Sequence, residues 1–407
     1  MKPFAAITIA ALLVFSMANS APVNAYLADS TVPQTGGCPQ PDHFNPSLAS
    51  PLSRQWSTSL STIPPTVLTV ATQGTSDQLD EIEQVISDSF GTWSGVSGTT
   101  LNATTYPGVL GPITRVTAAD SCTNDQLSDA DGLNTICFNQ SSTGFSTGVL
   151  AFTRVLTATA PGATLGASGP AAFAGQILDA DTLFRNDGEA TFATPGALAT
   201  TAGQGAYDLE SLLIHELGHW FGFDHSAVWR AVMFPFAPPP GQFLGDRPTA
   251  QTPDGPLSDD DRSGIRWLYP DPSDTTYIGA IRGQLLPANP FALAMYASPS
   301  PGSAVTGIFG AQVVAVDADT GSVIAATLGG WSCSASSSAP QFDGSFSIER
   351  LPLGHNYVIY AEPLVGLATP GDFSIALNDL CSSDAASSCT TPSANTNFNP
   401  AFRPAAP

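Results

Sequence analysis

The sequence predicts an α+β domain followed by a smaller all-β domain. Within the first 270 residues, three segments have the apolar spacing or the end signals of helices, and strand-like segments lie among them. After residue 276 the pattern changes to short alternating strands separated by turns. Residues 270–276, a run of Pro, Asp, Ser and Thr, mark the boundary. We therefore expect domains at 52–272 and 273–370, and we expect the first to fold without the second.

The first 25 residues have the pattern of a secretory signal peptide. Lys2 precedes an apolar segment from Phe4 to Met17, and Val23-Asn24-Ala25 provides a small-residue cleavage site. The apolar segment is too short to span a membrane comfortably, and no later segment reaches about 18 apolar residues. We expect a secreted, extracellular protein, with an uncleaved anchor as the alternative.

Composition limits the partners. The chain has 12 Lys and Arg against 34 Asp and Glu, a net charge of −22. Such a surface repels phosphate groups, which argues against nucleic acid, and it offers no polybasic segment for anionic lipid. We expect a monomer with no membrane anchor.

The elements of the first domain follow in order. Residues 26–51 have little periodicity and are expected to be a leader, and residues 64–72 are expected to be a strand. Thr75 and Gln78 are a candidate capping box for the first helix. Its apolar residues recur at steps of three and four: Leu79, Ile82, Ile86, Phe90 and Trp93.

Candidate strands come next, at 112–118, 134–139, 148–157 and 176–184. Of these, Gly148–Thr153 is expected to be an edge strand. A second helix begins after the N-cap Asp208 and ends near Gly222, and a third runs from Ser258 to Tyr269.

The second domain is predicted to be a small β-sandwich. Val313, Ala315 and Asp317 alternate along one strand, and the turn at Thr320-Gly321 leads into the next. Further strands are expected at 345–348 and 357–361, and residues 371–407 are expected to be an irregular, cysteine-containing tail.

Three of the five histidines fall within residues 215–225, His-Glu-Leu-Gly-His-Trp-Phe-Gly-Phe-Asp-His. On a helix, His215 and His219 lie one turn apart and can share a tetrahedral Zn²⁺ at about 2.0–2.1 Å. Gly222 permits a sharp turn with positive φ, which brings His225 round as the third ligand. The fourth position stays open for water, as in catalytic rather than structural zinc sites. Incidental histidines on a buried helix are the alternative, which the full spacing argues against.

Glu216 is expected to face that water as the general base. Zinc would lower the pKa of the water towards about 7, hydroxide would attack a peptide carbonyl, and Glu216 would carry the proton to the leaving amine. Backbone amides near Leu150 and Ala151 would hold an extended peptide as an added strand. The expected function is that of a secreted zinc-dependent endopeptidase acting on a protein or peptide.

The zinc motif resembles that of the metzincin clan, and within it the matrixins. Ser226 follows the third histidine as in matrixins, and Ala231-Val232-Met233-Phe234-Pro235 resembles the Met-turn, an apolar floor beneath the metal. Leu257–Tyr269 resembles the closing matrixin helix, and Ile177–Asp181 the strand before the active-site helix. The resemblance covers about 52–270, and it implies a twisted mixed sheet, three helices and one catalytic zinc.

Some matrixin features are altered or missing. The chain has no histidine between His43 and His215, so no second, structural zinc is expected. A calcium site is a weaker expectation. Asp125, Asp129 and Asp131 are candidate carboxylate ligands, although a solvated acidic turn is the favoured interpretation of this loop. Asp179 and Asp181 are weaker candidates, and both are expected to face one polar side.

The cysteines allow a disulfide or a latency switch. Six cysteines in an exported chain favour disulfides. The local pairs would be Cys122 with Cys137 and Cys381 with Cys389. Cys38-Pro39-Gln40-Pro41-Asp42 resembles the matrixin switch, Cys-Gly-x-Pro-Asp, whose thiolate occupies the open zinc position, except for Pro39. The leader before Cys38 is short, and a free Cys38 would leave an odd number of cysteines to pair, so a disulfide of Cys38, for example with Cys333, is favoured instead.

The second domain resembles the carboxypeptidase-regulatory-like or transthyretin-like β-sandwich, through Gly310–Asp317, Asp343–Ile348 and Leu351-Pro-Leu-Gly. It contains no catalytic set. The alternative function is therefore a catalytically silent metzincin-fold adhesion protein that binds through this sandwich. The intact Glu216 and the three histidines favour the enzyme over this alternative.

Overall fold

The computed structural model describes residues 20–22, 68–71, 76–101, 114–116, 134–140, 145–158, 175–185, 188–198, 205–242, 256–288, 305–334, 341–364 and 401–404. Several expectations lie outside these residues. They are the cleavage site of the signal peptide, Cys38, the acidic loop with Asp125, Asp129 and Asp131, and most of the tail. In the described part of the chain, no helix is long and apolar enough to cross a membrane.

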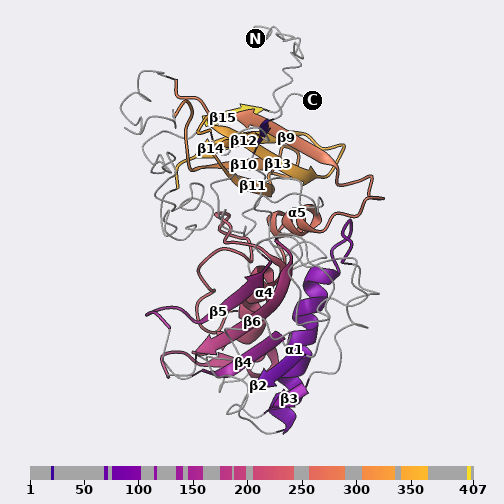
Figure 1. Cartoon of the computed structure of the whole chain (residues 1–407), viewed down its shortest axis with the longest axis vertical. Coiled ribbons are helices and arrows are strands. Elements are labelled where there is room, and N and C mark those ends of the chain that lie inside the picture. Colours follow the sequence, from indigo (N-terminus) through magenta and orange to yellow (C-terminus); the bar gives the residue numbers. More distant parts are fainter. Residues whose placement is uncertain are drawn as a thin grey trace, which may run out of the picture.

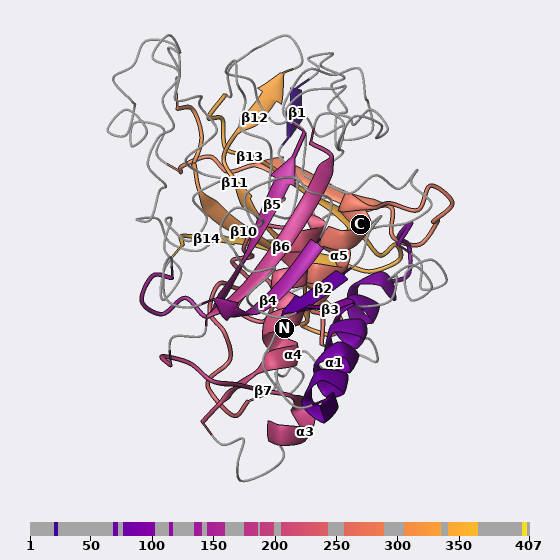
Figure 2. The ribbon, with the colours of Figure 1, turned by 60° about the horizontal axis from the view of Figure 1, so that its bottom comes forward.

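The first part of the chain builds a five-stranded mixed sheet (Figures 1 and 2). Its strands are β2 (Leu68–Ala71), β3 (Thr114–Val116), β4 (Asn134–Gln140), β5 (Ala151–Thr157) and β6 (Ile177–Arg185). Their order is β3-β2-β4-β6-β5; β5 runs antiparallel to β6, and the other pairs are parallel. The edge position expected of β5 is confirmed, although the strand begins at Ala151 rather than Gly148.

Two long helices pack together beside this sheet (Figure 2). They are α1 (Ser76–Ser94) and α4 (Leu209–Phe221). The predicted apolar face of α1 is confirmed: Ile86, Phe90 and Trp93 are fully buried. Phe90 meets Trp220 of α4 edge to face, with ring centroids 5.1 Å apart, and the Trp93 indole donates to Ile214 O at 2.8 Å. Three short elements precede α4: β7 (Phe192–Ala193), α3 (Pro195–Leu198) and β8 (Tyr207–Asp208).

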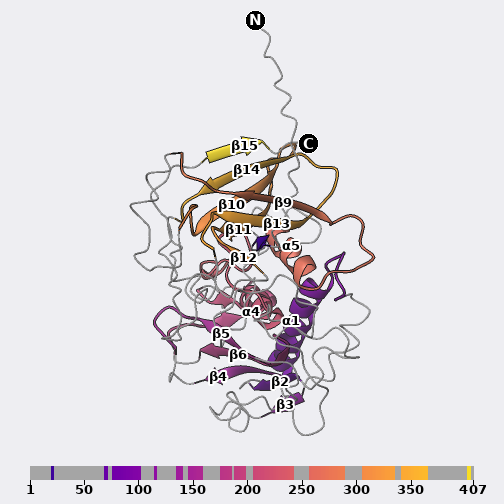
Figure 3. The same ribbon diagram turned by 45° about the horizontal axis from the view of Figure 1, so that its top comes forward.

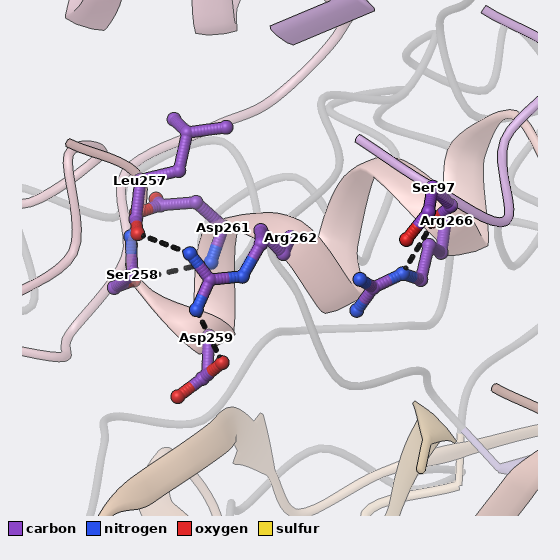
Figure 4. Close-up of polar contacts among 7 residues, drawn as sticks. All are labelled: Ser97, Leu257, Ser258, Asp259, Asp261, Arg262 and Arg266. Atoms are coloured by element: carbon purple, nitrogen blue, oxygen red, sulfur yellow. Dashed lines mark hydrogen bonds and ion pairs between the residues drawn. The ribbon is translucent and has the colours of Figure 1, made fainter. Parts of the chain in front are cut away.

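The closing helix α5 (Asp259–Leu268) is buried almost throughout. Ser258 and Asp261 form a capping box, which satisfies amides that the first turn leaves unpaired (Figure 4). Both arginines of the helix bond to loops: Arg262 Nη1 donates to Leu257 O at 2.7 Å, and Arg266 Nε donates to Ser97 O at 2.8 Å. The third predicted helix is thereby confirmed.

The remainder of the described chain contains strands and no helix, and α5 lies between these strands and the mixed sheet (Figures 1 and 3). One sheet has the order β11-β10-β14-β15. Its strands are β10 (Ala311–Asp317), β11 (Val323–Gly329), β14 (Tyr357–Glu362) and β15 (Ala401–Pro404). A second pairs β9 (Gly279–Gln284) with β13 (Ser345–Leu351), and a third pairs β1 (Ser20–Pro22) with β12 (Ser332–Ser334). All of these pairings are antiparallel.

Two features of this all-β part differ from expectation. Residues 401–404, expected to be irregular, form β15 and pair with β14, because the outer backbone groups of β14 would otherwise lack partners. Strand β1 lies within the expected signal peptide, so cleavage after Ala25 would remove it from β12.

Candidate metal centre

Helix α4 places two of the three predicted ligands. Asp208 caps its first turn and accepts from Ser211 N at 2.7 Å. Leu213 and Leu217 are buried in the core, which fixes the rotation of the helix about its axis. His215 and His219 then lie one turn apart on the partly buried side, as expected.

The third ligand depends on a glycine turn. Gly222 has φ 107°, a left-handed conformation that residues with a Cβ rarely adopt. Gly222 N donates to His219 O at 2.9 Å and Phe223 N donates to Gly218 O at 3.0 Å, the two hydrogen bonds of a Schellman motif. This turn ends α4 and brings His225 back beside the other two histidines.

The three imidazoles converge. One nitrogen from each of His215, His219 and His225 lies within 4.8 Å of the others, and their ring centroids are 4.9–5.3 Å apart. Among the described residues, no other group of His, Cys, Asp or Glu meets the same criterion. These nitrogens need only small movements to share one tetrahedral zinc ion.

Backbone carbonyls orient two of the rings. His215 Nδ1 lies 2.8 Å from Val232 O, and His219 Nδ1 lies 2.8 Å from Phe223 O. A ring that donates Nδ1–H to a carbonyl keeps the Nε2 lone pair for a metal. Burial, and then the neighbouring His225 and His215, hold the pKa of His219 well below its usual value, so this ring is neutral as a ligand must be.

Glu216 lies in a buried position beside the histidines and is 4% exposed. Burial raises its pKa to about 7, and a hydrogen bond from Thr153 opposes that rise. Thr153 Oγ1 donates to Glu216 Oε2 at 2.7 Å, and it lies 2.9 Å from Thr182 Oγ1. Sequence reasoning missed Thr153. Its only signal is its place on the predicted edge strand, two residues beyond Ala151.

The Met-turn lies directly against α4. Met233 is 1% exposed, and a Cβ on Gly218 would lie 2.1 Å from its Sδ atom. The glycine between the first two histidines therefore makes room for the methionine. Asp261 of α5 fixes the turn, because its carboxylate accepts from Val232 N at 2.8 Å and from Met233 N at 3.2 Å.

Other predicted site residues have mixed outcomes. Leu150 precedes β5, and its carbonyl accepts from Arg185 N at 3.1 Å, while Ala151 opens the strand. Asp179 and Asp181, expected on a polar side, are instead buried, and Asp181 Oδ1 accepts from Thr135 N at 2.8 Å. That bond joins β6 to β4, which explains a carboxylate in the sheet. Cys137 is disulfide-bonded, as expected of an exported chain.

Comparison with known proteins agrees with this geometry. Residues 161–270 match the family model of the matrixins. A stretch of 83 residues is 34% identical to Metalloendoproteinase 1 of Glycine max. It covers 20% of this chain and 24% of the plant protein, so the chain spans about a quarter of that relative. The family match begins at residue 161, whereas the expected resemblance began near residue 52. Residues 161–270, which include the histidine cluster, are therefore similar to the matrixins.

Proposed function

We propose that this protein is a secreted zinc-dependent endopeptidase. The observation that carries the proposal is the convergence of one ring nitrogen from each of three histidines within 4.8 Å, next to a buried glutamate. His215, His219 and His225 would hold the ion, and three protein ligands leave one position for water. A disulfide at Cys137 supports secretion, because disulfides persist in oxidising compartments.

The groups of this chain have distinct roles in the proposed reaction. Zinc bound by the three histidines would supply Lewis acidity towards a peptide carbonyl and a water molecule. Glu216 would take a proton from the water as its oxygen bonds to the carbonyl carbon, and would pass that proton to the amine nitrogen as the C–N bond breaks. A pKa near 7 suits both transfers, since the group can accept and release a proton at neutral pH. Thr153 holds the carboxylate of Glu216 in place through its hydroxyl group.

Strand β5 provides a surface for the substrate. It is the outer strand of the mixed sheet, and α4 packs against it. We propose that an extended peptide adds to this edge near Leu150 and Ala151, so that its scissile bond meets Glu216. Thr153, two residues beyond Ala151, contacts Glu216 directly, which supports a substrate path along this edge.

Two variants test the proposal. Glu216→Ala should keep one zinc per chain and lose most peptide hydrolysis, whereas His219→Ala should lose the metal as well. His355→Ala is the matched control, because His355 belongs to the all-β part and its side chain is 46% exposed. Metal analysis and cleavage of a peptide library measure both properties. Near-wild-type hydrolysis by Glu216→Ala would refute the mechanism. A wild-type chain that binds zinc without cleaving any peptide would favour the silent adhesion protein.

A further inference from the structure

The all-β part makes a buried contact with the segment that runs from the third histidine into the Met-turn. Val228 and Ala231 of that segment pack with Val314 of β10 and Ala326 of β11. The main core is also continuous across the boundary, since one cluster of buried apolar residues includes side chains of α4, α5, β10, β11 and β13. The break at 270–276 therefore separates two parts that share a core.

A buried carboxylate joins the two parts at this contact. Asp260, in the first turn of α5, is 4% exposed. Its Oδ2 accepts from Ser226 Oγ at 2.7 Å, and its Oδ1 accepts from Ala326 N at 2.7 Å. One side chain thus links a strand of the all-β part to the residue that directly follows the ligand His225.

Ala326 has no replacement for this acceptor within its own sheet. Strand β11 is the outer strand of its sheet, and Ala326 is paired with Val314 of β10 while its N–H donates outward to Asp260. An outer strand leaves alternate amides without a partner unless another element covers it. Loss of the bond would leave a buried amide on one side and a buried carboxylate with one partner fewer on the other.

Ser226 is fixed from several directions. Its N–H donates to Met233 O at 2.7 Å, and its Oγ accepts from Val228 N at 3.1 Å while it donates to Asp260. The neighbouring carboxylate of Asp261 holds the Met-turn amides at the same time. The first turn of α5 therefore fixes both the residue after His225 and the floor beneath the site.

We propose that the all-β part completes the zinc site, with Asp260 as the positioning residue that ties β11 to Ser226 and so to His225. This inference rests on the proposed zinc binding by the three histidines. It assigns the second domain a role in the metal centre rather than a role in binding a separate partner. It also replaces the expectation that the first domain folds on its own, because that domain alone would expose the apolar contact and leave Asp260 without Ala326.

Three variants of the full chain test the link. Ala326→Pro removes the N–H that reaches Asp260, and its place on an outer strand with that N–H outside the ladder is one that proline tolerates. Asp260→Ala removes both bonds of the bridge. Asp259→Ala is the matched control, because Asp259 lies in the same turn but pairs with Arg262 rather than with Ser226 or Ala326, and its side chain is 30% exposed.

Zinc affinity, measured by competition with a chelator, should fall about tenfold or more in Ala326→Pro and Asp260→Ala, because each loses an outer-shell hydrogen bond that holds the residue beside a metal ligand. It should stay near the wild-type value in Asp259→Ala. Circular dichroism checks that each variant is folded. Wild-type affinity in a folded Ala326→Pro chain would overturn the inference and leave the proposed function intact. A wild-type chain that binds no zinc would overturn both.

A second measurement needs no variant. Coupling is reciprocal, so zinc must stabilise the contact by as much as the contact stabilises zinc binding. Amide hydrogen exchange in residues 323–329 of the wild-type chain should therefore slow when zinc is added to the metal-free protein. Strand β14, on the other side of β10, is the internal control. Equal exchange in residues 323–329 with and without zinc would contradict the coupling.

Discussion

Gly218 provides a sharp test of how the zinc helix meets the Met-turn. A Cβ at this position would lie 2.1 Å from Met233 Sδ, 2.9 Å from Met233 Cε and 3.1 Å from Trp93 Cζ2. Ordinary contacts between such atoms begin near 3.4 Å, so Gly218→Ala must displace the thioether by more than an ångström. Overpacking of this kind costs about 1–3 kcal/mol. Replacing a helical glycine by alanine also stabilises the helix by about 1 kcal/mol.

Gly91 of α1 is the matched control, because it is also helical and a Cβ there would meet nothing within 4 Å. Both substitutions share the gain in helix stability, so the free energies of unfolding of the two variants should differ by about 1–3 kcal/mol. Gly91→Ala should be the more stable of the two. Urea unfolding of the zinc-loaded proteins measures the difference, and zinc affinity should fall in Gly218→Ala alone. Equal stability and equal zinc affinity in the two variants would refute the proposed contact between Met233 and α4.

Two further predictions concern hydrogen bonding and ionisation. Thr153→Val should lower kcat about tenfold with unchanged zinc content, because Glu216 loses a charge-assisted hydrogen bond. Thr153→Ser keeps the hydroxyl group and should restore activity, whereas an unchanged kcat in Thr153→Val would contradict the prediction. Burial, Asp208 and Asp88 raise the pKa of the half-buried Glu210 to about 7 from 4.5, so the folded state holds its proton longer than the unfolded state. As pH rises from 4.5 to about 7, the free energy of unfolding of the wild type should therefore fall relative to that of Glu210→Gln, by no more than about 2 kcal/mol after solvent screening. Chemical unfolding across this pH range measures the difference, and a difference that does not change with pH would rule the prediction out.

The zinc ligands can be predicted from the sequence because they lie close together along the chain. His215, Glu216 and His219 occupy one helix, and Gly222 turns the chain so that His225 follows within a few residues. The apolar face of α1 can also be predicted from the sequence, because apolar residues recur with the fixed period of a helix. The strands expected at 134–139 and 176–184 lie within a residue or two of β4 and β6.

What the sequence did not reveal are contacts between distant residues. Thr153 and Glu216 are 63 positions apart, and Asp260 and Ala326 are 66 apart. No periodicity links such pairs, because their approach is set by how whole elements pack. For the same reason the sequence pattern predicts that Asp181 faces a polar side, whereas the residue is buried and its Oδ1 accepts a hydrogen bond from Thr135 N. The strand at 401–404 depends likewise on the free edge of β14 rather than on its own residues.

The central claim is that three histidines of this chain hold one zinc ion with a position left for water. X-ray absorption at the zinc edge of the active, full-length protein tests it most directly. We predict three nitrogen ligands and one oxygen ligand, all at about 2.0–2.1 Å. His219→Ala should lose this signal, whereas Glu216→Ala should keep it. A wild-type protein with no bound zinc, or one whose zinc is enclosed by four protein ligands, would contradict the claim.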